Sequence, residues 1–178
     1  MSEQASDRHV VILGLMGVGK SSTGRVLAQL MGRAYSDSDI EIERVTGQAG
    51  RSFASEMGIP ALHELEAALL LGALARPAPH VITAAASVVE NELVAQLLPK
   101  GAFVVRLTAS LETTRERQAD GNHRRAMGVD ELAELAARRE PLFNAVEDIV
   151  LDAARTTQQL AYKILDAMRS KGLFYDVR

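Results

Sequence analysis

Cysteine and tryptophan are both absent from this chain of 178 residues. The lack of cysteine excludes disulfide bonds and thiolate metal sites, and it is typical of proteins in a reducing compartment. No segment combines the length and the apolarity of a membrane span. The first residues, MSEQASDR, lack the apolar core of a secretion signal. These absences together predict a cytoplasmic protein without a membrane partner.

The sequence also lacks an excess of charge of one sign. Its 20 Lys and Arg residues stand against 23 Asp and Glu residues, which gives a formal net charge of −3. An overall charge of this kind does not attract nucleic acid. The length suits one domain with a sizeable core, and the sequence contains no internal repeat or low-complexity linker. We therefore expect residues 1–178 to form a single domain.

Residues 9–31 contain a sequence pattern that is typical of a functional site. Residues 10–13 (VVIL) have the length and branching of a buried strand, and apolar residues recur at helical spacing over 26–31. Between them lies GLMGVGKS, a glycine-rich phosphate-binding pattern that runs from Gly14 to Ser21. A plain glycine-rich turn with a surface lysine is the alternative interpretation. The order of strand, loop and helix favours the phosphate loop.

The residue types of this loop suit the tail of a nucleoside triphosphate. Glycines permit positive φ and let the backbone come close to a ligand. The N–H groups of the loop converge beside the positive end of a helix, which favours an anion. Lys20 can reach the outer phosphates, and the Ser21 hydroxyl can ligate Mg²⁺. The predicted nucleotide-binding residues of this segment are Gly14, Met16, Gly17, Val18, Gly19, Lys20, Ser21 and Ser22.

Apolar strand patterns alternate with helical patterns along the rest of the chain. This alternation predicts an α/β fold with a parallel sheet that is covered on both faces. The expected strands are 10–13, 34–36, 80–83, 103–107 and 149–151. The expected helices, besides the one after the phosphate loop and one that runs through Glu43, are 52–57, 60–74, 90–98, 111–118, 129–139 and 156–169. The polar, glycine-bounded segment 120–128 is expected to be an exposed loop.

Two carboxylates, Asp37 and Asp39, follow the second expected strand. Because ligands bind outside the carboxyl ends of parallel strands, both can share a crevice with the γ-phosphate. One is suited to the water shell of a metal ion, and the other to accepting a proton from an acceptor hydroxyl. The alternative for Asp39 is a plain helix N-cap. The sequence lacks the Asn-Lys-x-Asp segment of GTPases and the acid-terminated strand of motor ATPases, which leaves the kinases.

These features resemble the shikimate kinase family of small ATP-dependent kinases over nearly the whole chain. The resemblance rests on GLMGVGKSSTGRVLAQLMGRAYSDSDIEIERVTGQ, SFASEMGIPALHELEAALL, VITAAASVV, RERQADGNHRRAMG, ARREPLF and DIVLDAARTTQQLAYKIL. It implies a three-layer α/β/α P-loop kinase fold whose five-stranded parallel sheet has the order 2-3-1-4-5. It also implies a mobile lid at residues 119–129, an acceptor-binding region at residues 37–66, ATP and Mg²⁺ as ligands, and a monomer.

The resemblance also implies roles for individual residues. Ser21 and Asp37 would hold Mg²⁺, and Asp39 would bind the acceptor hydroxyls and act as the base. Arg125 would close with the lid over the phosphates and so add to the nucleotide site. The predicted catalytic residues are therefore Lys20, Asp39 and Arg125. The predicted acceptor-binding residues are Asp39, His63, Ala85, Ala86, Ser87 and Arg139, of which Arg139 would grip a carboxylate.

Three segments depart from the family pattern. His63 stands where the family motif Phe-Arg-x-x-Glu has an arginine, and one imidazole cannot make a two-pronged grip. The sequence AAS at 85–87 replaces a glycine triplet whose N–H groups face the acceptor, and added Cβ atoms narrow that floor. In the lid, the family's Arg-Pro-Leu-Leu is RAMG at 125–128. The nucleotide half of the pattern is thus intact, and the acceptor half has changed.

We therefore expect a kinase that transfers the ATP γ-phosphate to a hydroxyl of a small anionic acceptor. Shikimate or a related cyclic polyhydroxy acid is the expected acceptor, because Asp39 and Arg139 are present. Three alternatives stay open at this point. They are a shikimate-kinase-like enzyme with another acceptor, a nucleotide kinase, and a non-catalytic regulatory module that binds nucleotide and an effector.

Overall fold

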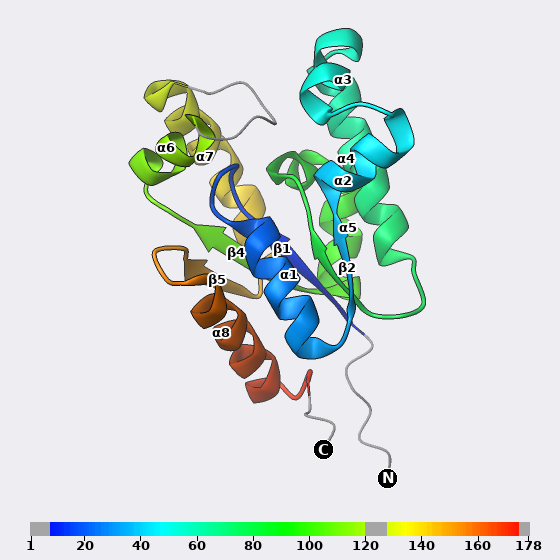
Figure 1. Ribbon diagram of the computed structural model, residues 1–178, viewed down its shortest axis with the longest axis vertical. Helices are drawn as coiled ribbons and strands as arrows, with labels where there is room; N and C mark the ends of the chain where they lie inside the picture. Colours follow the sequence, from blue (N-terminus) through cyan, green and yellow to red (C-terminus); the bar gives the residue numbers. More distant parts are fainter. Residues whose placement is uncertain (1–7, 120–127, 175–178) are drawn as a thin grey trace.

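The structure is a computed structural model that describes residues 8–119 and 128–174. Five parallel strands form one sheet in the order β2-β3-β1-β4-β5 (Figure 1). This order and the all-parallel pairing confirm the predicted α/β class and topology. The strands are β1 (His9–Leu13), β2 (Ala34–Asp37), β3 (His80–Thr83), β4 (Ala102–Thr108) and β5 (Ile149–Asp152).

Helices cover both faces of this sheet, so the molecule has three layers (Figure 1). The helices are α1 (Lys20–Met31), α2 (Ser38–Thr46), α3 (Gly50–Met57), α4 (Ile59–Leu74), the 3₁₀ helix η1 (Ala86–Glu90), α5 (Glu92–Gly101), α6 (Leu111–Ala119), α7 (Val129–Asn144) and α8 (Thr157–Ser170). No helix in the two described stretches is long and apolar enough to cross a bilayer.

The side-chain alternation of β1 divides the core in two. Val11 and Leu13 pack with apolar residues of α4, α5 and α7 on one face. Val10 and Ile12 pack with α1 and α8 on the other face. Since β1 is fully buried on both faces, its apolar run is continuous rather than alternating. The phosphate loop that follows β1 therefore starts from the most deeply buried strand of the sheet.

Local signals explain most of the helix boundaries. The Asn91 side chain accepts a hydrogen bond from the backbone N–H of Val94 and so caps α5. Thr156 and Gln159 form a reciprocal capping box at the start of α8. Pro60 lies in the first turn of α4, where its missing N–H has no helical partner to lose.

Most predicted helices differ from the structure by a few residues at one or both ends, and two of these differences have a clear physical cause. The helix expected at 90–98 begins only at Glu92, because Asn91 caps it, and Glu90 instead ends η1. The helix expected at 129–139 continues through Pro141 to Asn144. Tertiary contacts stabilise that last turn, since Phe143 is buried and Glu140 binds Arg106 of β4 through both carboxylate oxygens.

Candidate active site

The loop between β1 and α1 has the backbone geometry of a phosphate cradle. Gly14, Gly17 and Gly19 have φ values of 140°, 87° and 95°, all in the region that side chains rarely adopt. A Cβ on Gly14 would lie 2.3 Å from the carbonyl oxygen of Leu107, whereas one on Gly19 would meet no atom within 4 Å. The loop is thus tight at its base and open at the N-terminus of α1, where an anion is favoured.

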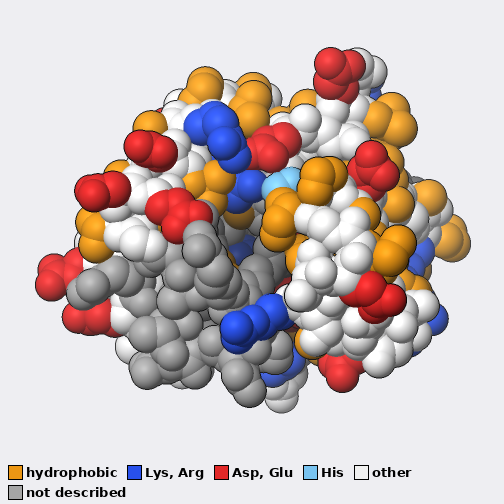
Figure 2. All heavy atoms as spheres, turned by 90° about the horizontal axis from the view of Figure 1, so that it is seen from above, with side chains coloured by type: hydrophobic (Ala, Val, Ile, Leu, Met, Phe, Trp, Pro, Cys, Tyr) orange, Lys and Arg blue, Asp and Glu red, His pale blue; other side chains and the backbone are white. Residues whose placement is uncertain are grey.

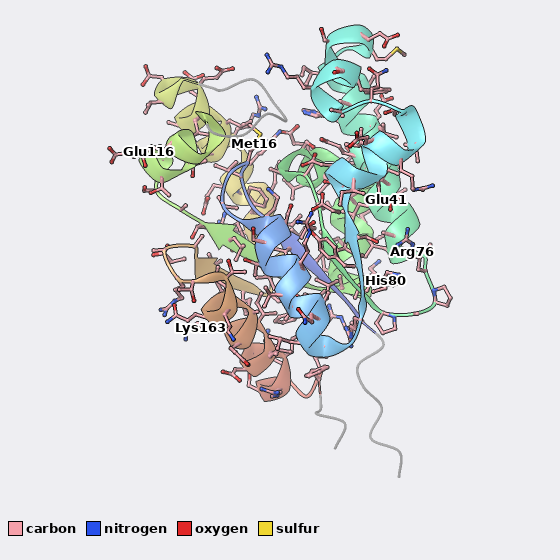
Figure 3. All side chains as sticks on the ribbon, in the orientation of Figure 1. Met16, Glu41, Arg76, His80, Glu116 and Lys163 are labelled. Atoms are coloured by element: carbon pink, nitrogen blue, oxygen red, sulfur yellow. The ribbon has the colours of Figure 1, made fainter. Side chains whose placement is uncertain are left out.

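Lys20 lies back over the loop. Its Nζ donates hydrogen bonds to the carbonyl oxygens of Gly14 at 2.9 Å and Leu15 at 3.1 Å. These bonds keep the ammonium beside the cradle, where phosphates would lie. Figure 3 shows Met16 at the tip of this loop, with His80 at the opposite end of the sheet.

The other predicted nucleotide-binding residues of the loop differ in exposure. Val18 is buried, and its side chain belongs to the core on the α1 face, so its backbone alone is suited to a ligand. Ser22 is exposed in the first turn of α1, and Ser21 is half-buried beside it. Arg125 lies outside the described residues.

Asp37 is buried at the end of β2 and is held by several hydrogen bonds. Its Oδ2 accepts from the Tyr35 hydroxyl at 2.7 Å, and its Oδ1 accepts from the Asp39 backbone N–H at 3.0 Å. Burial alone would raise the pKa of Asp37. Hydrogen bonds from the side chains of Ser21 and Tyr35 and from the Asp39 amide outweigh burial, and the pKa is lowered. Asp37 is therefore an anion that contacts Ser21 at the start of α1.

Tyr35 fixes this arrangement from the middle of β2. Its hydroxyl lies 2.9 Å from Thr83 Oγ1 on the neighbouring strand β3, in addition to its bond with Asp37. Burial raises the pKa of Tyr35 to about 12, so the phenol stays protonated and donates a hydrogen bond to the carboxylate of Asp37. Gly24 lies against the ring, since a Cβ at Gly24 would be 2.7 Å from Tyr35 Cε2. This packing holds α1 close to β2.

Asp39 is the second residue of α2 and is partly exposed. It does not cap the helix, because Asp37 accepts the capping hydrogen bond from the Asp39 N–H. The interpretation of Asp39 as a plain N-cap is therefore wrong. The two carboxylates follow one strand but differ in burial, since Asp37 is buried and Asp39 is partly exposed.

The donor set fits Mg²⁺ in one particular way. Among residues 8–119 and 128–174, no three His, Cys, Asp or Glu side chains gather in a group that could hold a metal ion. Ser21 and Asp37 nevertheless lie close together, because the Tyr35 hydroxyl is within hydrogen-bond distance of both the Asp37 carboxylate and the Ser21 carbonyl oxygen. Mg²⁺ commonly binds through one or two protein oxygens, with phosphates and water as its other ligands.

The predicted floor of the acceptor pocket, Ala85-Ala86-Ser87, joins β3 to η1. All three residues are buried. Ala85 has an ordinary extended conformation, with φ −63° and ψ 150°, and no non-glycine residue in the described chain has positive φ. The turn therefore accommodates the three Cβ atoms without backbone strain. The Ser87 hydroxyl donates to the carboxylate of Glu66, a fully buried residue of α4.

Glu90, at the end of η1, gathers the basic residues that were predicted to bind the acceptor. Its Oε1 accepts from Arg139 Nε at 2.8 Å and from Arg138 Nη2 at 3.2 Å. His63 Nδ1 lies 3.8 Å from Oε2 of the same carboxylate. The structure thus brings Arg139 and His63 together around a carboxylate of the chain itself.

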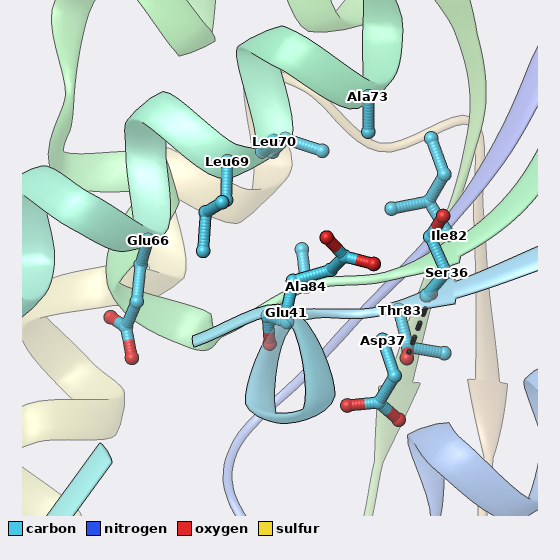
Figure 4. Close-up of a pocket in the computed structure, with 11 residues that line it drawn as sticks. Ser36, Asp37, Glu41, Glu66, Leu69, Leu70, Ala73, Ile82, Thr83 and Ala84 are labelled. Carbon is cyan, nitrogen blue, oxygen red and sulfur yellow. Dashed lines mark hydrogen bonds between the residues drawn. The ribbon is translucent and has the colours of Figure 1, made fainter. Parts of the chain in front are cut away.

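A pocket opens beside Asp37, between α4 and the ends of β2 and β3. The cavity is small, with a volume of about 20 Å³. Figure 4 shows the carboxylates of Asp37, Glu41 and Glu66 around it. Among the predicted site residues that the structure describes, Asp37 alone lines this pocket. The apolar part of the lining is Leu69, Leu70, Ala73, Ile82 and Ala84.

Sequence reasoning did not identify Tyr35, Glu66 or Glu90. The Tyr35 hydroxyl contacts Thr83, which is 48 residues away along the chain, and Glu90 contacts Arg139 across 49 residues. No local pattern predicts such contacts. The one available signal concerned Glu66, which stands at the glutamate position of the family motif Phe-Arg-x-x-Glu.

Comparison with known proteins shows where this arrangement belongs. The family model for shikimate kinase matches residues 16–169. The chain belongs to the shikimate kinase family. Curated shikimate kinases of Caulobacter vibrioides and Corynebacterium glutamicum are 32% and 34% identical to it over 165 and 163 residues. These alignments cover 90% and 89% of this chain and 82% and 93% of those proteins.

Solved shikimate kinases have the same fold. The Acinetobacter baumannii enzyme in complex with shikimate superposes with a TM-score of 0.87 at 27% identity, over 94% of this chain and 96% of that one. The Aquifex aeolicus enzyme has a TM-score of 0.80 at 20% identity, over 93% and 98% of the two chains. As a shikimate kinase family member, this protein is an ATP-dependent phosphotransferase of the P-loop kinase type, as predicted.

Proposed function

We propose that this protein transfers the γ-phosphoryl group of ATP to a hydroxyl of shikimate or a related cyclic polyhydroxy acid. The observation that best supports this is the position of the Tyr35 hydroxyl, which lies 2.7 Å from the Asp37 carboxylate at the end of β2 and 3.3 Å from the Ser21 carbonyl oxygen at the end of the phosphate loop. It joins the triphosphate cradle to the strand end that carries Asp39. The Acinetobacter baumannii relative, which was solved with shikimate, supports the choice of acceptor.

Each residue has a role that its position suits. Lys20 offsets negative charge on the transferring phosphoryl group, and Arg125 does the same from the lid. Ser21 and Asp37 hold Mg²⁺, which neutralises phosphate charge when bound. Asp39 orients the acceptor hydroxyl and accepts its proton, since it is partly exposed and lies two residues after the buried Asp37. These contributions are positioning and electrostatics.

The acceptor contacts are proposed to come from two further elements. Ala85, Ala86 and Ser87 form the floor after β3, while His63 and Arg139 face the acceptor carboxylate from α4 and α7. We further propose that the whole chain, 1–178, is a single domain that acts as a monomer in the cytoplasm. Its acceptor-binding region is 37–66 and its lid is 119–129. The absence of cysteine supports a reducing compartment.

An acceptor-dependent ATP consumption assay tests this function. Purified protein is mixed with ATP, Mg²⁺ and increasing shikimate, and ADP release is followed together with phosphorylated product. We expect saturable product formation that Asp39→Asn lowers by about 100-fold or more, because the base is lost. Asp166→Asn, on the exposed surface of α8, removes the same charge and should leave the rate unchanged. ADP release without any phosphorylated product would contradict the proposal.

A regulatory module that binds nucleotide and an effector is the second candidate. The observation that favours it is the engagement of predicted acceptor residues within the chain, Ser87 with Glu66 and Arg139 with Glu90. A variant with His63→Arg and glycine at 85, 86 and 87 separates the candidates. Phosphorylation of shikimate by the variant alone would show that the native chain uses another ligand.

A further inference from the structure

The cluster around Glu90 borders the place where an acceptor would bind. β3 pairs with β2 on one side and with β1 on the other. The chain that leaves β3 therefore lies between the strand that ends in Asp37 and the strand that leads into the phosphate loop. η1 follows β3 and packs against α4 and α7, which supply His63 and the two arginines. Figure 2 shows a hollow in this face of the molecule, bordered by basic, acidic and histidine side chains.

The charges in this cluster are only partly balanced. Arg139 is buried, with a side chain 7% exposed, and its Nε is bound to Glu90. Arg138 is exposed and shares the same carboxylate oxygen. Burial would raise the pKa of Glu90, but hydrogen bonds and charge from Arg139 and Arg138 outweigh it and lower the pKa. The single negative charge of Glu90 thus offsets only one of the two guanidinium charges that it contacts.

An internal carboxylate at this position has a direct consequence for ligands. Guanidinium groups bind carboxylates because of their charge and their forked donors. Glu90 already uses the Arg139 Nε donor, and its negative charge lies where the carboxylate of an acceptor would approach. Like charges a few ångströms apart repel strongly in a partly desolvated site. A neutral hydroxyl would accept or donate hydrogen bonds here without that repulsion.

We propose that Glu90 is a specificity-determining residue of the acceptor pocket. Its carboxylate competes with the carboxylate of an acceptor for Arg139 and repels it. The native chain therefore binds shikimate or a related cyclic acid more weakly than it would without this charge. The location of the acceptor pocket in this inference rests on the proposed function.

The test compares binding of shikimate and of its neutral methyl ester to native protein and to Glu90→Gln. Glutamine keeps an oxygen that can accept from Arg139 Nε, so the substitution removes charge while it preserves the contact. We expect the affinity for shikimate, measured by calorimetry in the presence of ADP, to rise about tenfold or more in Glu90→Gln. The affinity for the ester should change less than about twofold.

Glu140→Gln is the matched control. Glu140 is the residue after Arg139 on α7, but it pairs with Arg106 instead, so this variant removes the same charge without touching the cluster. It should not improve shikimate binding. Glu90→Ala, which also removes the charge, provides a second variant, and thermal unfolding verifies that both Glu90 variants fold.

Three results would overturn the proposal. They are unchanged or weaker shikimate binding by the Glu90 variants, an equal gain for acid and ester, and undetectable shikimate binding by every protein. A rise in the KM for shikimate would instead make Glu90 a residue that positions Arg139 for the acceptor. Binding is measured separately from product formation. A gain in shikimate affinity in the Glu90 variants without any phosphorylated product would therefore refute the proposed function and still support the role of Glu90.

Discussion

Gly14→Ala tests whether the base of the phosphate cradle is as tight as the structure indicates. The added Cβ would lie 2.3 Å from the Leu107 carbonyl oxygen in β4, and β4 is the direct neighbour of β1 in the sheet. Relief of this overlap requires the loop or the strand to shift, which costs about 1–3 kcal/mol. The φ of 140° adds about 1–2 kcal/mol for a residue with a side chain.

We therefore expect Gly14→Ala to lower the free energy of unfolding by about 2–5 kcal/mol, measured by urea denaturation. In a chain of this size that corresponds to a fall in Tm of about 5–15 °C. The variant should also lose ATP affinity, because a shifted loop no longer presents its N–H groups together.

Gly32→Ala is the control for the conformational part of this cost. Gly32 ends α1 with a φ of 61°, and a Cβ there would meet no atom within 4 Å. Its substitution should cost only about 1 kcal/mol and leave ATP affinity unchanged. Equal losses of stability in the two variants would refute the argument from the Leu107 contact, as would normal ATP affinity in Gly14→Ala.

Three further predictions concern charged groups. Lys20→Met should fold normally yet lower the rate of phosphoryl transfer by about 100-fold or more in the ADP-release assay, and a smaller effect would remove Lys20 from the catalytic residues. The pKa of Asp37 in the folded protein lies below its ordinary 3.8. Ionised Asp37 therefore stabilises the fold above pH 3.8, and this stabilisation is lost as the pH falls through the lower pKa of the folded state. Asp37→Asn should flatten the fall in unfolding free energy below pH 4, and an unchanged slope in urea titrations would contradict the hydrogen bonds described for Asp37. Arg106→Leu should lower the free energy of unfolding by about 2–3 kcal/mol, because Glu147 and Glu140 both lose their cationic partner. The effect comes mainly from Glu147, since the more exposed Glu140 can be hydrated by water instead. A loss below about 0.5 kcal/mol in urea denaturation would show that these ion pairs do not stabilise the fold.

The sequence was most informative where local chemistry determines the structure. The loop from Gly14 to Ser21 could be predicted because its glycines, lysine and serine act through a contiguous backbone. The strand order was implied by the resemblance to the family. Helix starts at Pro60 and near Thr156 also follow from residues a few positions apart.

The sequence was less informative where distant residues meet. Asp37 rather than Asp39 caps α2, which depends on how β2 ends. The last turn of α7 survives Pro141 because Phe143 and Glu140 have partners on other elements. The changes at 85–87 looked obstructive in the sequence, yet the turn adopts ordinary backbone angles. No local pattern could place Glu90 among the basic residues, since those contacts bring together α4, η1 and α7.

The central claim is that the cradle and the neighbouring carboxylates together transfer a phosphoryl group to a bound hydroxyl. The most direct measurement is ³¹P NMR of protein incubated with Mg²⁺, ATP and shikimate, with Lys20→Met and Asp39→Asn run in parallel. We expect a new phosphomonoester signal that grows as the ATP γ-phosphate signal falls. Both substitutions should nearly abolish this new signal. An ATP γ-phosphate signal that does not change, or one that is replaced only by inorganic phosphate, would contradict the central claim.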